Sequence, residues 1–542
     1  MEPSVIPARL PPGEDEQRCY YYGLISRPRL VARSDTKPWV PLKIEWPRGK
    51  RFDPVGEHRI VSLWNDLNNK TLRQEILGVL ESAAICWRSI DILRLGHEMY
   101  YDSPEEEYHI KLLISVDIGS TTWEQGHAAV MQCHDILQQH DIHDVHCEMK
   151  ELSIFHPDSR PIAPTTPTTP TTPTAPPNAP KLSTGEIAQP AYTNILFSEY
   201  LGHSIAAYNQ PSEEGTKCLY LRLRNSEKVL ALTCRNVVFG PEALNEDYRH
   251  NEAAPESAVT IIQPGKDTFD LQLGIHTRDH HTEEIVALLH IDKIKSEDAR
   301  KSSIASVRAK RLHSEQAKQM LENHSDPASR IIGHVLFSPK YGNDTPAGSS
   351  TQPRLRDWAL IELHPGKHTS PLTKLYNQVS ATSEGWHRLW HATAIECVPS
   401  RVTALPNMDR DTIELQGTLP ETEMKAPNGG NPAIIVAKHG KSTGFTIGLA
   451  NSVMTLRRET IADKQCISEE WCILGQKTES TSRRLDFSDV GDSGACVWDT
   501  QARIGGMITG GDGGDITYTT PIEWLLEDIR SYGYDVELCE YE

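Results

Sequence analysis

The first 150 residues alternate between two hydrophobic patterns. Apolar and β-branched residues bounded by turn residues, a pattern typical of strands, recur at 89–95, 108–116 and 144–149. Apolar residues at helical spacing over 69–87 and 121–139 predict two helices, one of which would cover a face of the sheet. We therefore expect an α+β domain over residues 18–156.

A Pro/Thr-rich stretch interrupts this pattern. The unit Pro-Thr-Thr repeats from 164 to 173, and further prolines follow until 180. Such a composition favours extended polyproline II and cannot bury a core. Residues 157–190 are therefore predicted to be a linker.

After the linker, the pattern is that of short strands. Apolar runs lie at 217–223, 228–233, 258–262, 330–337, 392–398 and 433–448. One segment differs, because from 283 to about 326 the chain is rich in Lys, Arg, Glu, Ala and Gln, with Thr282 able to cap a helix and Pro327 beyond its end. We expect an all-β region over 191–535 with a helical insertion at about 283–326.

Composition and charge restrict the class of protein. A chain of 542 residues favours two to four domains, and its net charge of −19 argues against a nucleic-acid-binding protein. No signal peptide and no membrane span are predicted, because no long apolar run occurs. The 11 cysteines lack the dense spacing of a disulfide scaffold, so we expect reduced thiols and an intracellular, cytoplasmic or nuclear, protein.

The candidate chemistry lies near the end of the chain, in the loop Gly491-Asp492-Ser493-Gly494. Glycines on both sides of a serine allow backbone N–H groups to face one point, where an oxyanion could be stabilised. Gly, Asp and Ser are also the residues of ordinary turns, so the context decides. A strand, a hairpin, a glycine-rich edge and a closing strand follow over 495–521.

With these strands, the loop resembles the nucleophile loop of trypsin-like (chymotrypsin-fold) serine peptidases, of the intracellular type seen in uncharacterised fungal proteins. The resemblance covers 191–535 and includes Asp357, in a segment that matches the family's Asp-x-Ala-Leu-x-x-Leu strand, and the hairpin at 438–444. It implies two six-stranded β-barrels with Ser493 as nucleophile, and an oxyanion hole formed by the loop N–H groups of Gly491, Asp492 and Ser493.

The expected general base is missing. In the family a His follows a strand that ends as 229–235 does here, but the next residue is Asn236. An amide cannot take the Ser493 proton near neutral pH, and loss of the base costs roughly 10⁶-fold in turnover, about 8 kcal/mol. The resemblance thus predicts a catalytically inactive pseudopeptidase that binds a peptide or protein where Asn236, Asp357 and Ser493 meet. Two alternatives stay open: an active serine endopeptidase with His439 or His203 as base, and a structural platform for the N-terminal domain and the helical insertion.

The resemblance also indicates where a ligand would bind. Phe487, six residues before the nucleophile, would form the base of the first pocket, and Gly510 and Gly511 would line its edge, which favours an apolar or small anchor side chain over Arg or Lys. No cofactor is expected, and the His and Cys residues of 127–147 lack the tight spacing of a zinc site. The sequence gives no indication of oligomeric state or of the partner's identity.

Overall fold

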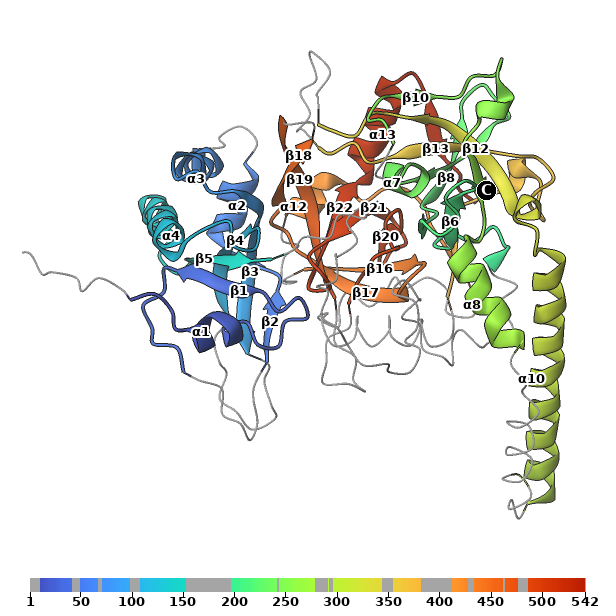
Figure 1. The fold of residues 1–542 in the computed structure, drawn as a ribbon, viewed down its shortest axis with the longest axis horizontal. Coiled ribbons are helices and arrows are strands. Elements are labelled where there is room, and N and C mark those ends of the chain that lie inside the picture. Colours follow the sequence, from blue (N-terminus) through green and yellow to red (C-terminus); the bar gives the residue numbers. More distant parts are fainter. Residues whose placement is uncertain are drawn as a thin grey trace, which may run out of the picture.

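The chain is mainly β-sheet with fewer helices, as predicted (Figure 1). The computed structural model describes residues 10–40, 49–66, 71–97, 108–152, 196–240, 243–277, 291, 296–343, 354–381, 412–426, 433–461, 464–475 and 486–541. The predicted linker at 157–190 and the predicted strand at 392–398 lie outside these residues. No helix in the described ranges is long and apolar enough to cross a membrane.

Residues 10–152, called here the N-terminal module, form one sheet with helices on a face. Its strands are β1 (Arg29–Arg33), β2 (Lys50–Asp53), β3 (Trp87–His97), β4 (His109–Val116) and β5 (His146–Glu151), and its helices are α1 (Glu14–Cys19), α2 (Arg59–Asn65), α3 (Thr71–Ser82) and α4 (Trp123–Gln139). The order is β1-β5-β4-β3, with β2 also on β3. Only β4 and β5 are parallel, and α4 connects them after a capping box formed by Thr122 and Gln125. Apolar side chains of α2, α3 and α4 share a core with this sheet.

Six strands near the C-terminus close into a barrel. They are β16 (Ile434–Gly440), β17 (Gly444–Ala450), β19 (Lys464–Gly475), β20 (Cys496–Asp499), β21 (Ile504–Gly511) and β22 (Ile516–Pro521). Each pairs with two others in the ring β16-β17-β19-β22-β21-β20, and β20 returns to β16. Closure leaves no open edge among these six strands and surrounds a core that includes Val436, Trp471 and Val497.

The second sheet also curves back on itself. Its strands are β6 (Ser204–Ala207), β7 (Glu214–Thr216), β8 (Leu219–Leu223), β9 (Val229–Thr233), β10 (Tyr248–Arg249), β11 (Thr260–Ile262), β12 (Ile331–Ser338), β13 (Ala359–Leu363) and β23 (Val536–Leu538). The order is β23-β8-β9-β13-β12-β11-β6-β7, with β10 beside β12. Strands β7 and β8 are two halves of one bent strand, because the Lys217 N–H donates to the His203 carbonyl at 3.0 Å and continues the β6–β7 pairing, and the Cys218 N–H donates to the Leu232 carbonyl at 2.9 Å and continues the β8–β9 pairing. The described strands therefore lead from β9 through β13, β12, β11 and β6 back to β7 and β8, a ring of the kind predicted for the second six-stranded barrel, and β23 pairs with β8 beyond it.

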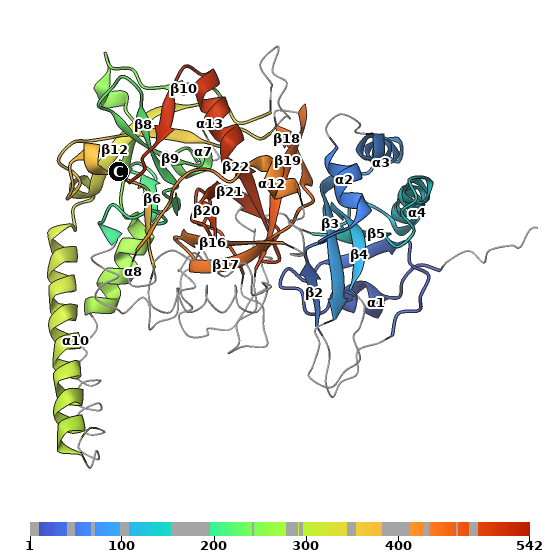
Figure 2. The ribbon, with the colours of Figure 1, turned by 180° about the vertical axis from the view of Figure 1, so that it is seen from behind.

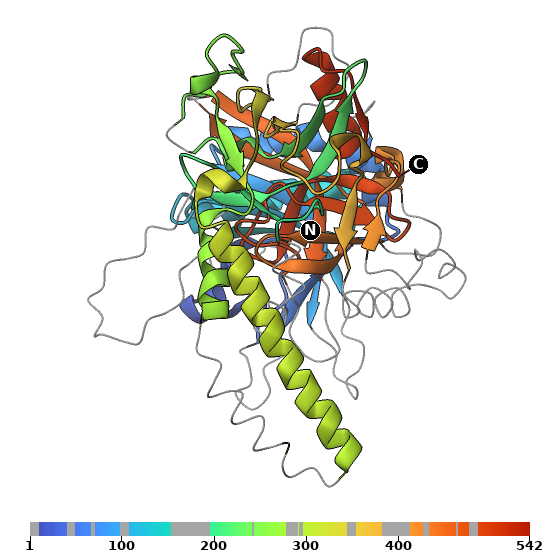
Figure 3. The same ribbon diagram turned by 90° about the vertical axis from the view of Figure 1, so that its right-hand side faces the viewer.

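The remaining elements are short, with one exception. They connect the strands of the sheets. They are helices α7 (Arg235–Val238), α8 (Lys266–Thr277), α12 (Glu421–Lys425) and α13 (Ile522–Ser531), the 3₁₀ turns η1 (Pro255–Ser257), η2 (Pro327–Arg330) and η3 (Leu372–Lys374), and the strand pair β14 (Gln378–Ser380) with β15 (Thr412–Glu414). Helix α10 (Glu297–Asn323), within the predicted insertion, projects away from the body with α8 beside its C-terminal end (Figures 1 and 3). Ala317 and Leu321 are the buried side chains of that end.

The N-terminal module and the barrel share a sheet. Strand β18 (Thr455–Ile461) pairs with β19 of the barrel and also with β3, where Leu456 lies opposite Ile90. Figures 1 and 2 show the module beside β18 and β19 from both sides. The apolar face of the module that its helices leave free packs on β19 and β22 in a cluster that includes Leu93, Leu113 and Tyr518.

Candidate active site

The loop at 487–494 is held by two neighbouring elements. Gly491 and Gly494 adopt φ angles of 97° and 90°, in the left-handed region that glycine tolerates best. A Cβ on Gly491 would lie 2.5 Å from Ser442 Oγ in the β16–β17 turn, and one on Gly494 would collide with the Thr216 carbonyl at the end of β7. The glycines of the motif are therefore required by the close approach of the β16–β17 hairpin and of the second sheet at the end of β7.

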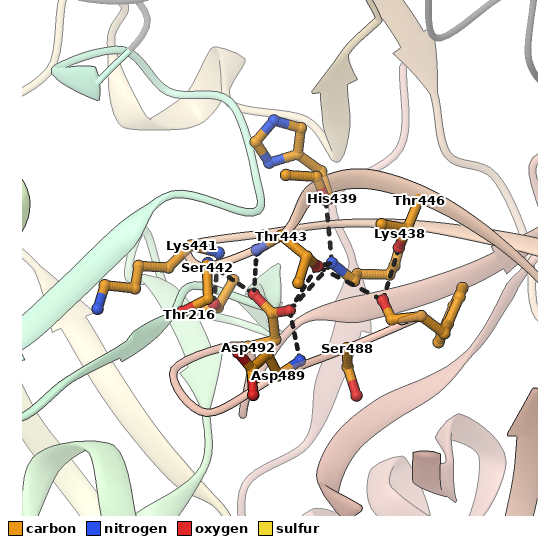
Figure 4. A network of polar contacts seen from close by, with 12 residues as sticks. Thr216, Lys438, His439, Lys441, Ser442, Thr443, Thr446, Ser488, Asp489 and Asp492 are labelled. Atoms are coloured by element: carbon orange, nitrogen blue, oxygen red, sulfur yellow. Dashed lines mark hydrogen bonds and ion pairs between the residues drawn. The ribbon is translucent and has the colours of Figure 1, made fainter. Parts of the chain in front are cut away.

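A buried ion pair fixes the loop to the β16–β17 hairpin (Figure 4). Lys438 Nζ lies 3.2 Å from Asp492 Oδ2, and neither side chain has any exposure. The carboxylate also accepts the N–H groups of Ser442 at 2.7 Å and Asp489 at 3.0 Å and the Thr443 hydroxyl at 2.6 Å. Burial raises the pKa of Asp492, but Lys438 and these donors outweigh it, so the pKa lies below its usual value. The pair keeps the loop rigid, which is what a preorganised site needs.

Backbone hydrogen bonds around Ser493 decide which N–H groups of the predicted oxyanion hole are available. The Asp492 N–H donates to the Asp489 carbonyl at 2.9 Å, so it is not available to a ligand, and this corrects the prediction for that group. The N–H groups of Gly491 and Ser493 have no hydrogen-bond partner among the described residues. Thr216 N–H donates to the Ser493 carbonyl at 2.9 Å, and the Thr216 hydroxyl donates to the Gly491 carbonyl at 2.9 Å. Both carbonyls are thereby fixed, and two N–H groups are left for an oxyanion.

Asn236 and Asp357 are in direct contact. Antiparallel pairing of Ala359 with Thr233 brings the residues before β13 opposite those after β9, where α7 begins. Asn236 Nδ2 donates to Asp357 Oδ2 at 2.8 Å, and the Asn236 backbone N–H donates to Oδ1 at 3.2 Å. Asp357 is 2% exposed. The amide side chain thus makes the contact with the carboxylate that the family resemblance implies for a His.

The end of β9 also contacts the serine loop. The Cys234 thiol donates to the Ile508 carbonyl at 3.2 Å, and the Gly494 N–H donates to the same carbonyl at 2.8 Å. A Cβ on Gly494 would lie 2.6 Å from Thr233 Oγ1. The Asn236–Asp357 pair and the loop that carries Ser493 therefore lie on adjoining chain segments, at the junction of the second sheet and the barrel.

The two alternative bases do not contact Ser493 in the part of the chain that is described. His439 donates through Nδ1 to the Gly202 carbonyl at 3.2 Å, and its ring meets that of His203 edge to face at 5.2 Å. Figure 4 shows the His439 ring turned away from the Asp492 carboxylate. Burial and Lys438 lower the pKa of His439 to about 4, and burial, His439 and Lys217 lower that of His203 well below its usual value. Both histidines are neutral rings in the interior of the molecule.

A small pocket lies beside Ser493. Its volume is about 30 Å³, enough for a water molecule or a small side-chain group. The lining residues are Ser488, Asp489, Val490, Ser493, Ile508, Gly510, Gly511, Gly513 and Gly514. Gly510 and Gly511 are among the residues that line this pocket.

Phe487 does not line this pocket, which corrects the sequence prediction. Its side chain is 1% exposed and belongs to the barrel core. The next residue, Ser488, faces the pocket instead and shares a hydrogen bond of 2.6 Å with the Thr517 hydroxyl. Residue spacing from the nucleophile could not distinguish these two neighbours, because a difference of one position decides which side chain faces inward.

Two functional groups escaped the sequence analysis. Thr216 makes four hydrogen bonds at the junction, with the carbonyls of Ser493 and Gly491, the Lys441 N–H and the Thr233 hydroxyl, and nothing in its local pattern indicates this role. Lys438 lies in a recognised hairpin motif, but its partner Asp492 is 54 residues away and had been assigned through its backbone only. Among the described residues, no group of three His, Cys, Asp or Glu side chains could hold a metal ion.

Comparisons with known proteins give no family for the chain. No protein-family model and no curated protein matches it. Among solved structures, chymotrypsin of Cellulomonas bogoriensis is similar at 15% sequence identity over 39% of this chain and 81% of that chain, with a TM-score of 0.20. The active form of the Rv3671c protease of M. tuberculosis is similar at 10% identity over 68% of this chain and 95% of that chain, with a TM-score of 0.22. At these TM-scores neither likeness bears on the fold or the function of this chain.

Proposed function

We propose that residues 191–535 form a trypsin-like serine peptidase homologue that has lost its general base and binds a peptide or protein beside Ser493. Support for the peptidase ancestry comes from the closed barrel, the clamped glycine loop and two unengaged N–H groups next to Ser493. Support for a binding role comes from the pocket that remains beside this serine.

The observation that carries the proposal is the 2.8 Å hydrogen bond from Asn236 Nδ2 to Asp357 Oδ2. In a working triad, a carboxylate orients an imidazole whose second nitrogen takes the serine proton. Here the carboxylate orients an amide. The remaining Asn236 oxygen accepts hydrogen bonds but is not basic near neutral pH, so Ser493 stays a weak nucleophile.

The alternative of an active peptidase with another base has less support. His439 and His203 are engaged with Gly202 and with each other, away from the carboxylate of Asp357. The alternative of a structural platform is favoured by one observation, the sheet that β18 shares with β3. That role and ligand binding are compatible, because β18 lies outside the closed ring that carries the pocket.

The test of the lost base is labelling by a fluorophosphonate probe, which reacts with an activated serine. We expect no labelling of the wild type and clear labelling of Asn236→His, because Asp357 is already placed to orient the new ring. The double variant Asn236→His with Ser493→Ala should not label. Wild-type labelling as strong as that of Asn236→His would contradict a lost base, and absence of labelling in both would mean that the defect extends beyond position 236.

The binding role is tested on a peptide array with the full chain. We expect a preference for small or apolar anchor side chains, because the pocket holds only a small group. Gly510→Val should weaken this preference, since Gly510 lines the pocket and its new side chain would press on the buried Arg457 guanidinium, 3.3 Å from the added Cβ, and displace this strand. Gly274→Val in α8, where a Cβ meets no atom within 4 Å, is the matched control. Binding dominated by Arg or Lys anchors would refute the proposed pocket.

A further inference from the structure

One wall of the pocket beside Ser493 is the turn between β21 and β22. This turn, residues 511–516, contributes three glycines to the pocket. Asp512 shapes it, because its Oδ1 accepts the N–H of Asp515 at 3.1 Å and of Ile516 at 2.7 Å. The Asp512 side chain is completely buried, so its surroundings determine where the turn lies.

The surroundings of Asp512 belong to the N-terminal module. Lys150 of β5 places its Nζ 3.6 Å from Asp512 Oδ2, and neither side chain has any exposure. Burial raises the pKa of Asp512 to about 7, with Lys150 opposing this and Asp515 and Asp91 adding to it. Lys150 also opposes the increase that burial causes in the pKa of Asp91, in β3. One ammonium group from the module thus compensates two buried carboxyl groups, one of which shapes the turn.

The other end of the turn is held by the segment that precedes β1. Asp515 accepts the backbone N–H of Ile25 at 2.9 Å and of Ser26 at 2.8 Å, and the Ser26 hydroxyl also donates to it. The Ile25 side chain lies over Gly514, where an added Cβ would be 2.9 Å from Ile25 Cγ2. Both ends of the pocket wall are therefore anchored on residues that precede the Pro/Thr-rich stretch.

Apolar contacts extend this anchoring along β22. Ile516 and Tyr518 pack in one cluster with Leu93, Leu95 and Leu113 of β3 and β4. The Tyr518 hydroxyl lies 3.5 Å from Asp91 Oδ2. The module therefore contacts the strand after the turn as well as the turn itself.

We propose that Lys150 and Ser26 are positioning residues for the pocket beside Ser493, so that ligand binding there depends on docking of the N-terminal module. The ligand-binding part of this statement rests on the proposed function, whereas the positioning part does not. Removal of the Lys150 ammonium leaves the ionised form of Asp512 without its buried partner, which is costly, so above the pKa of Asp512 the turn is favoured to move outward, where water can reach the carboxylate. The module then regulates the pocket without contacting the ligand.

The test measures hydrogen exchange of the full chain by mass spectrometry at a pH well above the Asp512 pKa of about 7, with Lys150→Met as the main variant. We expect exchange over residues 509–518 to accelerate at least ~10-fold, because the opening of the turn becomes easier. The hairpin at 434–450 should be unchanged. The double variant Lys150→Met with Asp512→Asn should recover most of the protection, since it removes the uncompensated charge.

Lys111→Met is the matched control, because Lys111 is a buried lysine of the same module that pairs with Glu148 at 2.9 Å. It should leave the 509–518 segment unchanged. If Lys150→Met does not fold, Ser26→Ala, which removes one donor to Asp515, should still accelerate exchange in the turn. Unchanged exchange at 509–518 in Lys150→Met, or equal acceleration in Lys111→Met, would overturn the proposal. Faster exchange together with the absence of any peptide binding by the wild type would support positioning and refute the proposed function instead.

Discussion

The buried pair of Lys438 and Asp492 leads to a quantitative prediction: Lys438→Met destabilises the barrel strongly. Breaking a buried ion pair from one side costs about 3–5 kcal/mol, because the other charge stays buried without compensation. Both side chains have no exposure, so solvent cannot take over the role of Lys438. Asp492 would keep the donors from Ser442, Thr443 and Asp489, and therefore we expect a loss of about 4 kcal/mol instead of complete unfolding.

A double-mutant cycle isolates the interaction between the two charges. The variants are Lys438→Met, Asp492→Asn and the combination of both, and the measurement is urea unfolding followed by tryptophan fluorescence, since Trp471 and Trp498 lie in the barrel. We expect the combined variant to be less unstable than the sum of the single ones by at least about 2 kcal/mol. Thermal unfolding should show a decrease of roughly 10 °C for Lys438→Met.

Lys228→Met is the control for loss of a lysine ion pair. Lys228 lies 2.9 Å from Glu362, but its side chain is 40% exposed, so its removal should cost at most about 1 kcal/mol. The reasoning would be refuted if Lys438→Met cost no more than Lys228→Met, or if the two single changes at 438 and 492 were additive.

Three further predictions concern pH, backbone and core. The pKa of His439 is about 4 in the folded protein, below the ordinary value near 6.5, so the folded state binds fewer protons than the unfolded state between these values. The protein should therefore lose up to about 3 kcal/mol of stability as pH falls from 6.5 to 4. His439→Gln should make the urea midpoint of unfolding less dependent on pH in this range. Gly494→Ala should cost about 3 kcal/mol or more, through both its φ of 90° and the collision with Thr216, whereas Gly119→Ala, at φ 71° in open space, should cost about 1 kcal/mol in the same urea assay. Phe487→Ala should lower the free energy of unfolding by about 3–5 kcal/mol, because it leaves a cavity in the barrel core, and should leave the anchor preference on the peptide array unchanged. An altered preference would show that Phe487 lines the pocket after all.

Local patterns were sufficient for the strands and for part of the site. The strand that ends at Thr233 and the segment that follows Asp357 were visible as apolar runs, and the register of one antiparallel pair then accounts for the Asn236–Asp357 contact. The wrong side chain was assigned to the pocket because Phe487 and Ser488 are neighbours and only the packing of the barrel decides which faces inward. Spacing from a nucleophile carries no information on that choice.

Long-range pairings could not be predicted. The edge of β8 is covered by β23 from the end of the chain, and no local pattern in either segment indicates this pairing. The contacts of Lys150 with Asp512 and of Ser26 with Asp515 join segments on opposite sides of the Pro/Thr-rich stretch. Periodicity reports which face of an element is apolar, but it does not report which distant element covers that face.

The pairing of β3 with β18 has a consequence for synthesis of the chain. The two strands are far apart in sequence, and the contact between Asp91 and Thr455 at this pairing spans 364 residues. At about 5–20 residues per second, the ribosome would deliver β18 roughly 20–70 s after β3. During that interval the part of β3 around Ile90 presents an unpaired strand edge, a surface that invites association with other nascent chains. We therefore expect productive folding of this protein to benefit from protection of that edge until β18 emerges.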